Sequence, residues 1–478
     1  MFPRLRRSFT VVVVLAMAGA LLLAPTASGT VGTQLWVARF AKPTLGNDIA
    51  SSMATSPDGT KVFVTGSTYQ GTACHDCTSP ADYETVAYDA VTGAEIWKAS
   101  YNGPGNADDK ASSVRVAPDG TKVFVTGASR DASVYYNYAT IAYDASSGTQ
   151  LWVSRYQGQA DYDSSAHALV VSLDGSKVLV TGESKMSSTG FDYATVAYDA
   201  ATGAQLWASR YDGPATGADF AHAMALSPGG ATVYVTGESW GGASHVDFAT
   251  VAYDVATGAQ GWVSRHSGPG FSQEMGQVIA ASPAGGRVFV AGESQGTTKD
   301  YDIVTICIGA GSGKEQWAMR YHGPGNGRDY PAGLAVSASG GTVYMGGMSY
   351  DGSATRNDYL AIAYSAKNGA IQWSRRIDSR ELPDMASAIA LGPGGGRLYI
   401  TGHSDSFGDI YLTLGLRTSS GKTAWYSHYD GPGTCCGGDY PTSLALAPGG
   451  SAIFITGSSW GDGSVGSYDF ATVAFSTA

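Results

Sequence analysis

The chain has 478 residues, of which 65 are glycine and only 14% are charged, and its formal net charge is −11 at pH 7. Abundant Gly, Ser, Thr, Val and Tyr are typical of short β-strands joined by tight turns. The excess of acidic residues excludes a basic surface for nucleic acid or anionic lipid.

Residues 1–29 are expected to be a secretory signal peptide. An arginine-rich start precedes the apolar run Val11–Leu23, which is too short for a comfortable membrane span, and small residues follow it. Arg6 and Arg7 leave twin-arginine export open beside the general secretory route. Without this segment, 26 basic residues stand against 40 acidic ones, a formal charge of −14. No later apolar run is long enough to span a bilayer, so we expect a secreted, extracellular protein.

Residues 30–478 contain one repeat array. Each repeat holds four strand-like segments, called a to d, which in the first repeat are Ala50–Ser56, Val62–Thr65, Asp82–Tyr88 and Ile96–Tyr101. Segment b ends on a glycine, and these glycines are Gly66, Gly127, Gly182, Gly237, Gly292, Gly347, Gly402 and Gly457. Four antiparallel strands repeated radially predict the blades of a β-propeller.

The two ends of the array complete one another. Gln34–Phe40 reads as a d strand with no a, b or c strand before it, and Asp469–Phe475 reads as a c strand with no d strand after it. The sequence therefore predicts an all-β, eight-bladed β-propeller over residues 30–478, closed by pairing the N-terminal strand with the C-terminal blade. Such closure leaves no open sheet edge, and we expect a monomer.

One tryptophan lies in each d strand and is expected to pack between neighbouring blades. These residues are Trp36, Trp97, Trp152, Trp207, Trp262, Trp317, Trp373 and Trp425. The segment Ala87-x-Asp89-x-x-Thr92-Gly93-x-x-x-Trp97 resembles the tryptophan-docking repeat of the pyrroloquinoline-quinone (PQQ) propeller superfamily. Tyr-x-Gly-Pro-Gly stretches at 101–105 and 321–325 are similar to the bacterial β-propeller repeat family often called SBBP. The resemblance implies the fold and says little of function.

A polar residue lies eleven positions before the glycine of each a–b turn. It is an acid in seven repeats and a serine in the third: Asp48, Asp109, Ser164, Asp219, Glu274, Asp329, Asp384 and Asp439. One interpretation is a carboxylate ring that binds a cation such as Ca²⁺, with Asp219, Glu274 and Asp329 as candidate ligands. The other is that each acid caps its own loop by accepting backbone N–H groups. Repetition in every blade favours capping, and the same holds for the acids that head the c strands.

Two departures from the repeat lie near the b–c and d–a loops, which share one face that we call the top face. His167 and His222 occupy equivalent places in adjacent blades, and with Glu274 nearby they are candidates for binding a metal or another ligand. The alternative is a pair of buried, hydrogen-bonded imidazoles.

Aromatic residues form the second departure. They stand three residues after the strand-b glycine in four blades, at Tyr69, Trp240, Tyr350 and Trp460. On the top face such rings are suited to stacking on sugars, and the alternative is a loop packed onto its neighbour.

Four cysteines lie in two lengthened top-face loops. Cys74 and Cys77 belong to the first repeat, and Cys435 and Cys436 precede the last. Export favours disulfides, but the sequence leaves the pairing open between bridges across the two loops and one bridge within each; a zinc site is the third alternative. Cys307 replaces a strand-c alanine and is predicted to be a buried free thiol.

The resemblance to PQQ alcohol dehydrogenases implies that a vicinal disulfide stacks against the quinone. Here the vicinal pair precedes the last blade, long inter-blade insertions are missing, and no motif matches the calcium-ligating or catalytic residues of those enzymes. We therefore expect a non-catalytic secreted propeller, without a cofactor, that binds a protein or glycan partner through its top face. The alternatives are a quinoprotein dehydrogenase that uses PQQ with calcium and a polysaccharide-active hydrolase or lyase with acids at the propeller axis.

Overall fold

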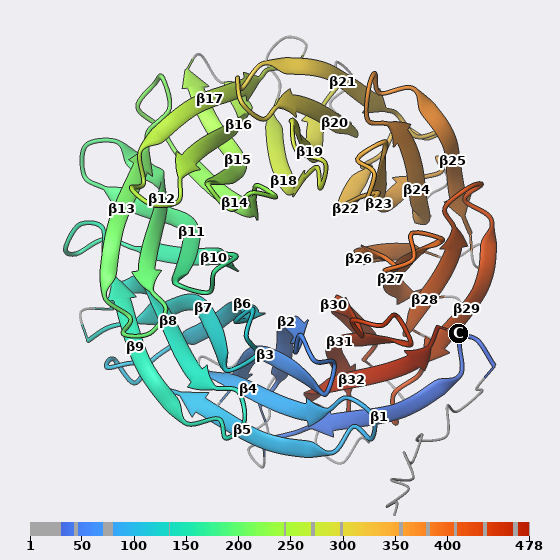
Figure 1. Ribbon diagram of the computed structural model, residues 1–478, viewed down its shortest axis with the longest axis horizontal. Helices are drawn as coiled ribbons and strands as arrows, with labels where there is room; N and C mark the ends of the chain where they lie inside the picture. Colours follow the sequence, from blue (N-terminus) through green and yellow to red (C-terminus); the bar gives the residue numbers. More distant parts are fainter. Residues whose placement is uncertain are drawn as a thin grey trace, which may run out of the picture.

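The computed structural model describes residues 30–42, 46–69, 80–132, 134–242, 245–268, 273–296, 300–352, 357–378, 383–405, 409–433, 437–461 and 467–477. Within these ranges 32 strands form eight four-stranded antiparallel sheets, which stand around a ring (Figure 1). The prediction of an eight-bladed β-propeller is confirmed. The expected signal peptide lies outside the described residues, and among those described no helix is long and apolar enough to cross a membrane.

The strands follow one another from the innermost strand a to the outermost strand d of each blade. Blades 1 and 2 comprise β2 (Asp48–Thr55), β3 (Lys61–Tyr69), β4 (Ala81–Asp89), β5 (Glu95–Tyr101), β6 (Asp109–Val116), β7 (Lys122–Arg130), β8 (Tyr136–Asp144) and β9 (Gln150–Tyr156). Blades 3 and 4 comprise β10 (Ser164–Val171), β11 (Lys177–Met186), β12 (Gly190–Asp199), β13 (Gln205–Tyr211), β14 (Asp219–Leu226), β15 (Thr232–Gly242), β16 (His245–Asp254) and β17 (Gln260–His266).

The second half of the ring repeats this order. Blades 5 and 6 comprise β18 (Glu274–Ala281), β19 (Arg287–Gln295), β20 (Tyr301–Gly309), β21 (Glu315–Tyr321), β22 (Tyr330–Val336), β23 (Thr342–Tyr350), β24 (Asn357–Ser365) and β25 (Ile371–Ile377). Blades 7 and 8 comprise β26 (Asp384–Leu391), β27 (Arg397–Ser404), β28 (Ile410–Arg417), β29 (Thr423–Tyr429), β30 (Asp439–Leu446), β31 (Ala452–Trp460), β32 (Tyr468–Ser476) and β1 (Gln34–Phe40).

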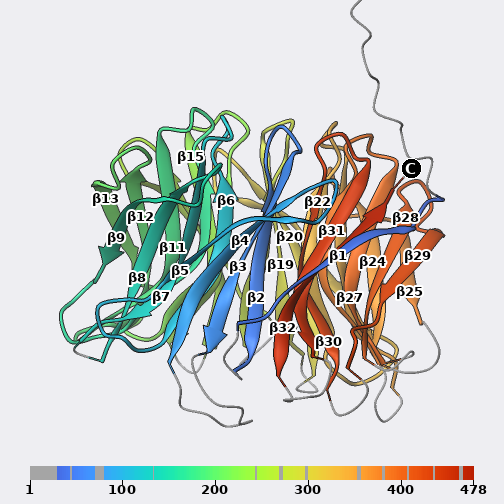
Figure 2. The ribbon, with the colours of Figure 1, turned by 90° about the horizontal axis from the view of Figure 1, so that it is seen from below.

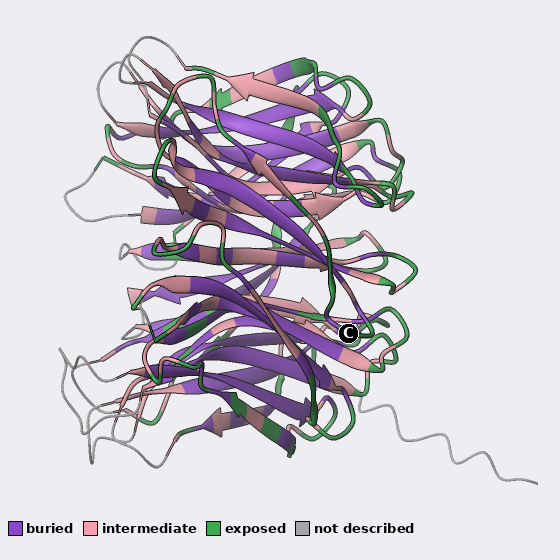
Figure 3. Cartoon of the chain, turned by 90° about the vertical axis from the view of Figure 1, so that its left-hand side faces the viewer, coloured by how far each residue is buried: buried purple, intermediate pink, exposed green. Residues whose placement is uncertain are grey.

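The core lies between the middle strands of neighbouring blades. Strands such as β3 and β4 are buried along nearly their whole length, because blades cover both of their faces. The outer strand β5 alternates between exposed and buried residues, as a half-covered sheet edge does. Figure 3 shows this gradient from buried middle strands to exposed turns. The β-branched and aromatic residues of segments b and c are therefore core residues.

Each docking tryptophan joins its blade to the next. The Trp97 indole N–H donates to the carbonyl oxygen of Ala145, in the c–d turn of blade 2, over 3.1 Å. The ring lies so close to the turn that a Cβ on Gly148 would come within 2.6 Å of it. Equivalent indole hydrogen bonds are made by Trp36, Trp152, Trp207, Trp262, Trp317 and Trp373. These contacts are the ones that a docking role requires.

The ring closes through the N-terminal strand, as predicted. β1 pairs antiparallel with β32, and Figures 1 and 2 show blue β1 along the outer edge of red β32. Gly32 supplies the turn glycine of this last junction: its φ is +81°, and a Cβ there would lie 3.1 Å from the Trp425 ring. The Ser427 hydroxyl donates to the Gly32 carbonyl over 2.7 Å, as Ser154 does to the turn glycine Gly203. The segment before β1 thus replaces the c–d turn that blade 8 lacks.

Gly32→Ala is expected to lower the free energy of unfolding by about 1–2 kcal/mol, because alanine is strained at positive φ and its Cβ presses on the indole. Equilibrium denaturation of the mature chain, followed by tryptophan fluorescence, measures the change. Gly229→Ala is the matched control, since no heavy atom lies within 4 Å of a Cβ at Gly229. Equal losses in both variants would contradict a closing role for Gly32.

Candidate functional site

The innermost strands turn one extra residue toward the propeller axis. In β10, Ala166 and Ala168 pair with consecutive residues of β11, so His167 between them forms a β-bulge. All eight a strands carry a register shift at this place, and the residues there are Ser51, Ser112, His167, His222, Gln277, Ala332, Ser387 and Thr442. A recurring bulge thus presents a different side chain in each blade, while the backbone stays the same.

The acids that begin the a strands are part of the frame. Asp219 is fully buried and accepts hydrogen bonds from the backbone N–H groups of Gly213 (2.8 Å) and Trp240 (2.9 Å), which hold the d–a and b–c loops together. Asp329 accepts the same pair of bonds in blade 6, and Glu274 accepts one from the Ser294 hydroxyl. Burial raises the pKa of Asp219 and of Asp329. The structure therefore places these acids in loop caps, not at the mouth of the channel.

The acids that head the c strands are neutralised by strand-d arginines, where loop capping was expected. Arg265 contacts the Asp247 carboxylate at 2.6 Å and also bonds the Ser239 hydroxyl and the Tyr211 hydroxyl of the preceding blade. The corresponding ion pairs are Arg39–Asp469, Arg210–Asp192, Arg320–Asp302 and Arg376–Asp358. This correction has a simple cause: the partners lie 18 residues apart within a blade, or across the ring closure, so no local pattern shows their contact.

The two bulge histidines lie side by side with two glutamates that the sequence analysis missed. His167 Nε2 lies 2.5 Å from Glu183 Oε2, and His222 Nε2 lies 3.9 Å from Glu238 Oε1. The two imidazole rings are 6.3 Å apart between centroids. Glu274, the expected third partner, is instead fully buried and accepts a hydrogen bond from the Ser294 hydroxyl.

Burial shifts the titration of this cluster. It lowers the pKa of His222 to about 4, and the neighbouring His167 lowers it further in the same direction. Burial, assisted by the Glu183 carboxylate, raises the pKa of Glu238 to about 7. The cluster therefore holds a neutral imidazole and a carboxyl group that exchanges its proton near neutral pH. Both glutamates directly follow the strand-b glycine, and a comparison of that position between blades would have found them.

A hollow of about 460 Å³ adjoins His167 near the axis. Its polar lining comes from the inner strands of blades 1 to 3 and from the start of β8: Ser51, Lys110, Ser112, Tyr136, Ser165 and His167. The Tyr136 hydroxyl donates to Asp108 over 3.1 Å, and Arg130 lies 4.8 Å over the Tyr136 ring. Lys110 is about half exposed and faces the same Asp108. The lining thus combines a cation, an imidazole, a phenol and three hydroxyl groups.

The four predicted aromatic residues lie at or near the ends of their b strands, not in loops, and are half-buried. The Trp240 ring packs against the d–a loop so closely that a Cβ on Gly217 would come within 2.4 Å of it, and Gly437 meets Trp460 in the same way. Gly327 stands equally close to Tyr350, and the Tyr69 N–H donates to the Asn47 carbonyl. Each aromatic residue therefore anchors the loop of its own blade, and its partial exposure leaves ligand contact a prediction.

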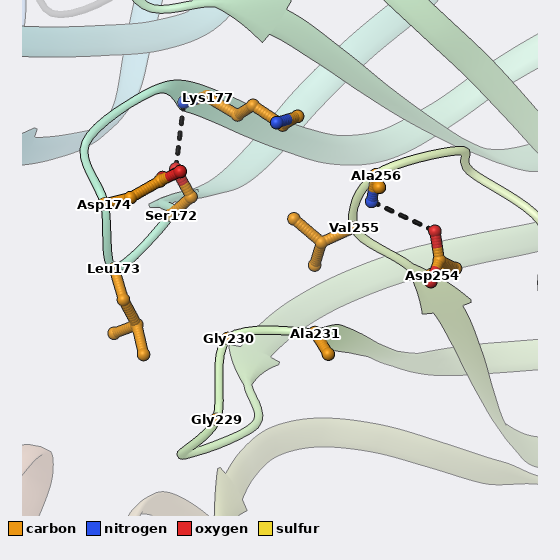
Figure 4. Close-up of a pocket in the computed structure, with 10 residues that line it drawn as sticks. All are labelled: Ser172, Leu173, Asp174, Lys177, Gly229, Gly230, Ala231, Asp254, Val255 and Ala256. Carbon is orange, nitrogen blue, oxygen red and sulfur yellow. Dashed lines mark hydrogen bonds between the residues drawn. The ribbon is translucent and has the colours of Figure 1, made fainter.

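A second hollow, of about 320 Å³, lies on the opposite face between the turns of blades 3 and 4 (Figure 4). Its polar groups hold turns: the Lys177 N–H donates to the Ser172 hydroxyl over 2.9 Å, and the Ala256 N–H donates to Asp254 over 3.1 Å. Equivalent bonds recur at Ser56 and Asp89 in blade 1. This hollow is a product of the repeated turns and offers little that distinguishes one ligand from another.

The cysteines divide into two groups. Cys307 is a buried free thiol, as predicted, and burial raises its pKa to about 12. Cys74, Cys77, Cys435 and Cys436 lie outside the described residues, so their disulfide pairing stays a prediction.

The chain is similar to known propellers. The family model described as outer membrane protein assembly factor BamB matches residues 26–239 and 247–434. Among solved structures, Chaetomium thermophilum Sqt1 bound to the N-terminus of the ribosomal protein L10 is 14% identical with a TM-score of 0.58, over 93% of this chain and 100% of that one. The quinohemoprotein alcohol dehydrogenase ADHIIG from Pseudomonas putida HK5 is 12% identical with a TM-score of 0.55, over 93% of this chain and 76% of that one.

A europium-containing methanol dehydrogenase is also 12% identical with a TM-score of 0.55, over 93% of each chain. No curated protein sequence matches. At these identities the solved structures show a likeness of fold alone.

Glu238→Gln is expected to flatten the dependence of stability on pH. The folded pKa of Glu238, about 7, lies above its ordinary 4.5, so its contribution is complete below pH 4.5 and is lost as pH rises through 7. Between pH 5 and 8 the wild type should lose about 1–3 kcal/mol of unfolding free energy that the variant keeps.

Chemical denaturation at the two pH values measures this difference. Glu95→Gln, at an exposed strand-d position, is the control and should leave the dependence unchanged. An equal pH dependence in wild type and Glu238→Gln would contradict the raised pKa.

Proposed function

Since the chain belongs to the PQQ-like propeller family described as outer membrane protein assembly factor BamB, we propose that it is an exported, non-catalytic propeller that binds a protein partner through its top face. The family match also confirms the resemblance to the PQQ superfamily that the tryptophan repeat indicated. The propeller supplies a rigid frame, and the side chains that differ between blades supply the specificity.

The observation that carries this proposal is the hollow beside the axis. Its lining is polar, varies from blade to blade and combines Lys110, Tyr136 and His167 with three serines. An ammonium group beside hydroxyl groups and an imidazole binds a carboxylate by charge-assisted hydrogen bonds. A volume of about 460 Å³ accommodates one or two amino-acid side chains of a partner. An acidic loop or a chain end is therefore the kind of protein segment that fits.

For the quinoprotein alternative that uses PQQ together with calcium, the residues of the axial hollow do not fit the calcium ion. Calcium takes six to eight oxygen ligands, several of them carboxylates. The described lining of the axial hollow includes no carboxylate. The nearest equivalent acids of the a strands are occupied by loop N–H groups, as in Asp219.

The second candidate function is a polysaccharide-active hydrolase or lyase, and Glu238 is the observation that favours it. Glycosidases pair a carboxylic acid of raised pKa with an ionised carboxylate. Glu238, with a pKa raised to about 7, corresponds to the acid, and the neighbouring Glu183 corresponds to the second carboxylate. Each glutamate lies beside a bulge histidine. In such a reaction Glu238 protonates the departing oxygen of the glycosidic bond.

The binding proposal predicts that the partner contacts the axial hollow. A photo-crosslinking amino acid at position 165, in the hollow, should capture the partner of the exported protein, whereas one at the exposed position 256, on the opposite face, should not. With the identified partner purified, Lys110→Ala and His167→Ala should each weaken binding about tenfold, since each removes one charge-assisted contact. Lys177→Ala, on the opposite face, is the matched control. Equal capture from both faces, or unchanged affinity in both hollow variants, would overturn the proposal.

The hydrolase candidate makes a separate prediction about activity. Mature protein incubated with pectin, alginate, chitin and cellulose should release new chain ends from at least one of them, and Glu238→Gln should slow this release at least about 100-fold. Glu95→Gln should leave the rate unchanged. If none of these polymers is cleaved, the second candidate fails and the binding proposal stands unaffected.

A further inference from the structure

Blade 7 breaks the rule by which the propeller neutralises its strand-c acids. In the five arginine pairs described above, a strand-d arginine lies against the acid that heads strand c, and in blade 1 Lys42 approaches Asp82 at 3.5 Å. In blade 7 the acid is Asp409, but His428 stands at the arginine position. The same blade adds a second acid, Asp405, where other blades carry aromatic, basic or amide side chains. Compared with the other blades, blade 7 thus lacks the arginine or lysine cation and has one additional carboxylate, that of Asp405.

The β27–β28 hairpin brings three metal-ligating side chains together. His403 pairs with Tyr411, and Ser404 pairs with Ile410. Asp405 and Asp409 are the next residues on either side of this last pair, so they stand opposite one another at the end of the ladder. His403 lies at the end of β27, and Asp405 directly follows the last residue of that strand. His403 Nε2 lies 2.9 Å from Asp405 Oδ1 and 3.0 Å from Asp409 Oδ1, and the three ligand atoms all lie within 4.8 Å of one another. The three ligand atoms are close enough together to converge on one ion bound at about 2.0–2.2 Å.

The cluster contains a buried oxygen atom that the protein leaves unsatisfied. His403 is more than nine-tenths buried, and its ring packs on Tyr440 with centroids 4.7 Å apart. The Nε2 atom of His403 carries one hydrogen at most and therefore donates to one oxygen atom. It is hydrogen-bonded to Asp409 Oδ1. Asp405 Oδ1 is buried, points at the same nitrogen and has no hydrogen-bond partner among the described residues. A cation at the shared point satisfies both carboxylates and the imidazole at once.

We propose that His403, Asp405 and Asp409 form a binding site for a divalent transition-metal ion, with Zn²⁺ as the preferred occupant. One imidazole and two carboxylates suit Zn²⁺ better than the all-oxygen set that Ca²⁺ or Mg²⁺ takes. Three protein ligands leave a fourth position for water or for a group from a bound partner. The ion takes the charge-balancing role that arginine has in other blades and locks the β27–β28 hairpin at the top face.

Two other clusters of the described residues lack this imbalance. Asp302 lies beside His322 in blade 5, and Asp192 lies beside Asp212 in blade 3. Asp302 already forms an ion pair with Arg320, and Asp192 with Arg210, at 2.8 Å in each case. His322 is also half exposed, whereas His403 is buried. Blade 7 is therefore the place where a metal ion replaces a missing partner, and blade 5 provides a matched control.

The test is a titration of metal-free mature protein with ZnCl₂ by isothermal calorimetry, repeated with CoCl₂ by absorbance. We expect one ion per chain at this site and Co²⁺ bands without a thiolate charge-transfer band, which separates it from a cysteine site. Asp405→Asn and His403→Gln should each weaken Zn²⁺ binding at least about tenfold, while His322→Gln should leave it unchanged.

Asp405→Asn keeps the shape of a partly exposed side chain, so its result holds even if His403→Gln fails to fold. Absence of stoichiometric binding, or affinity unchanged in Asp405→Asn, would overturn the proposal.

Discussion

Each blade is joined to the next by an indole ring that lies on a turn glycine, and at seven of the eight junctions the indole N–H donates to a turn carbonyl. The donor and acceptor are about 48 residues apart in the chain, so every such contact links two successive blades. Because the sheets stand in a closed ring, each blade is held by a junction on both sides, and only the a and d strands remain as short sheet edges. The junction between blade 7 and blade 8 is completed by Gly32, so the stability of the whole ring depends on a short segment before the first strand.

This frame explains where the variable side chains lie. Buried carboxylates are tolerated only with donors or cations beside them. Asp219 takes its donors from loop N–H groups, and Asp247 takes its cation from Arg265. Such pairs recur around the ring and fix the loops of the top face. The bulge of strand a and the position just after the strand-b glycine do not take part in these repeated pairs. The bulge carries His167 in blade 3, and the position after the glycine carries Glu183 in blade 3 and His403 in blade 7.

The sequence predicted the parts of the structure that repeat. Blade number, strand order, closure and the docking tryptophans follow from spacing, because every blade solves the same packing problem. The contact between Arg265 and Asp247 was not predicted, since the two residues lie on the neighbouring strands β17 and β16, where the pairing register decides which side chains meet. The role of Gly32 was missed for the opposite reason, because it occurs once and has no repeat to reveal it.

The sequence analysis named the two histidines of the His167 cluster but not its two glutamates. His167 and His222 were found because they interrupt a repeated position, but Glu274 was paired with them from its nearness in sequence. The partners are Glu183 and Glu238, which reach the bulge from the neighbouring strand of the same sheet. Which side chains meet across two strands depends on register, and the bulge shifts that register by one residue. A pattern read along one strand does not contain this shift.

The two departures from symmetry stand on opposite sides of the ring. The His167 cluster and the axial hollow belong to blades 1 to 4, whereas His403 belongs to blade 7, across the channel in Figure 1. Sites this far apart with no shared partner act additively when the frame between them is rigid. Each can therefore be altered without disturbing the other, and a ligand that coupled them would have to span the top face over the channel.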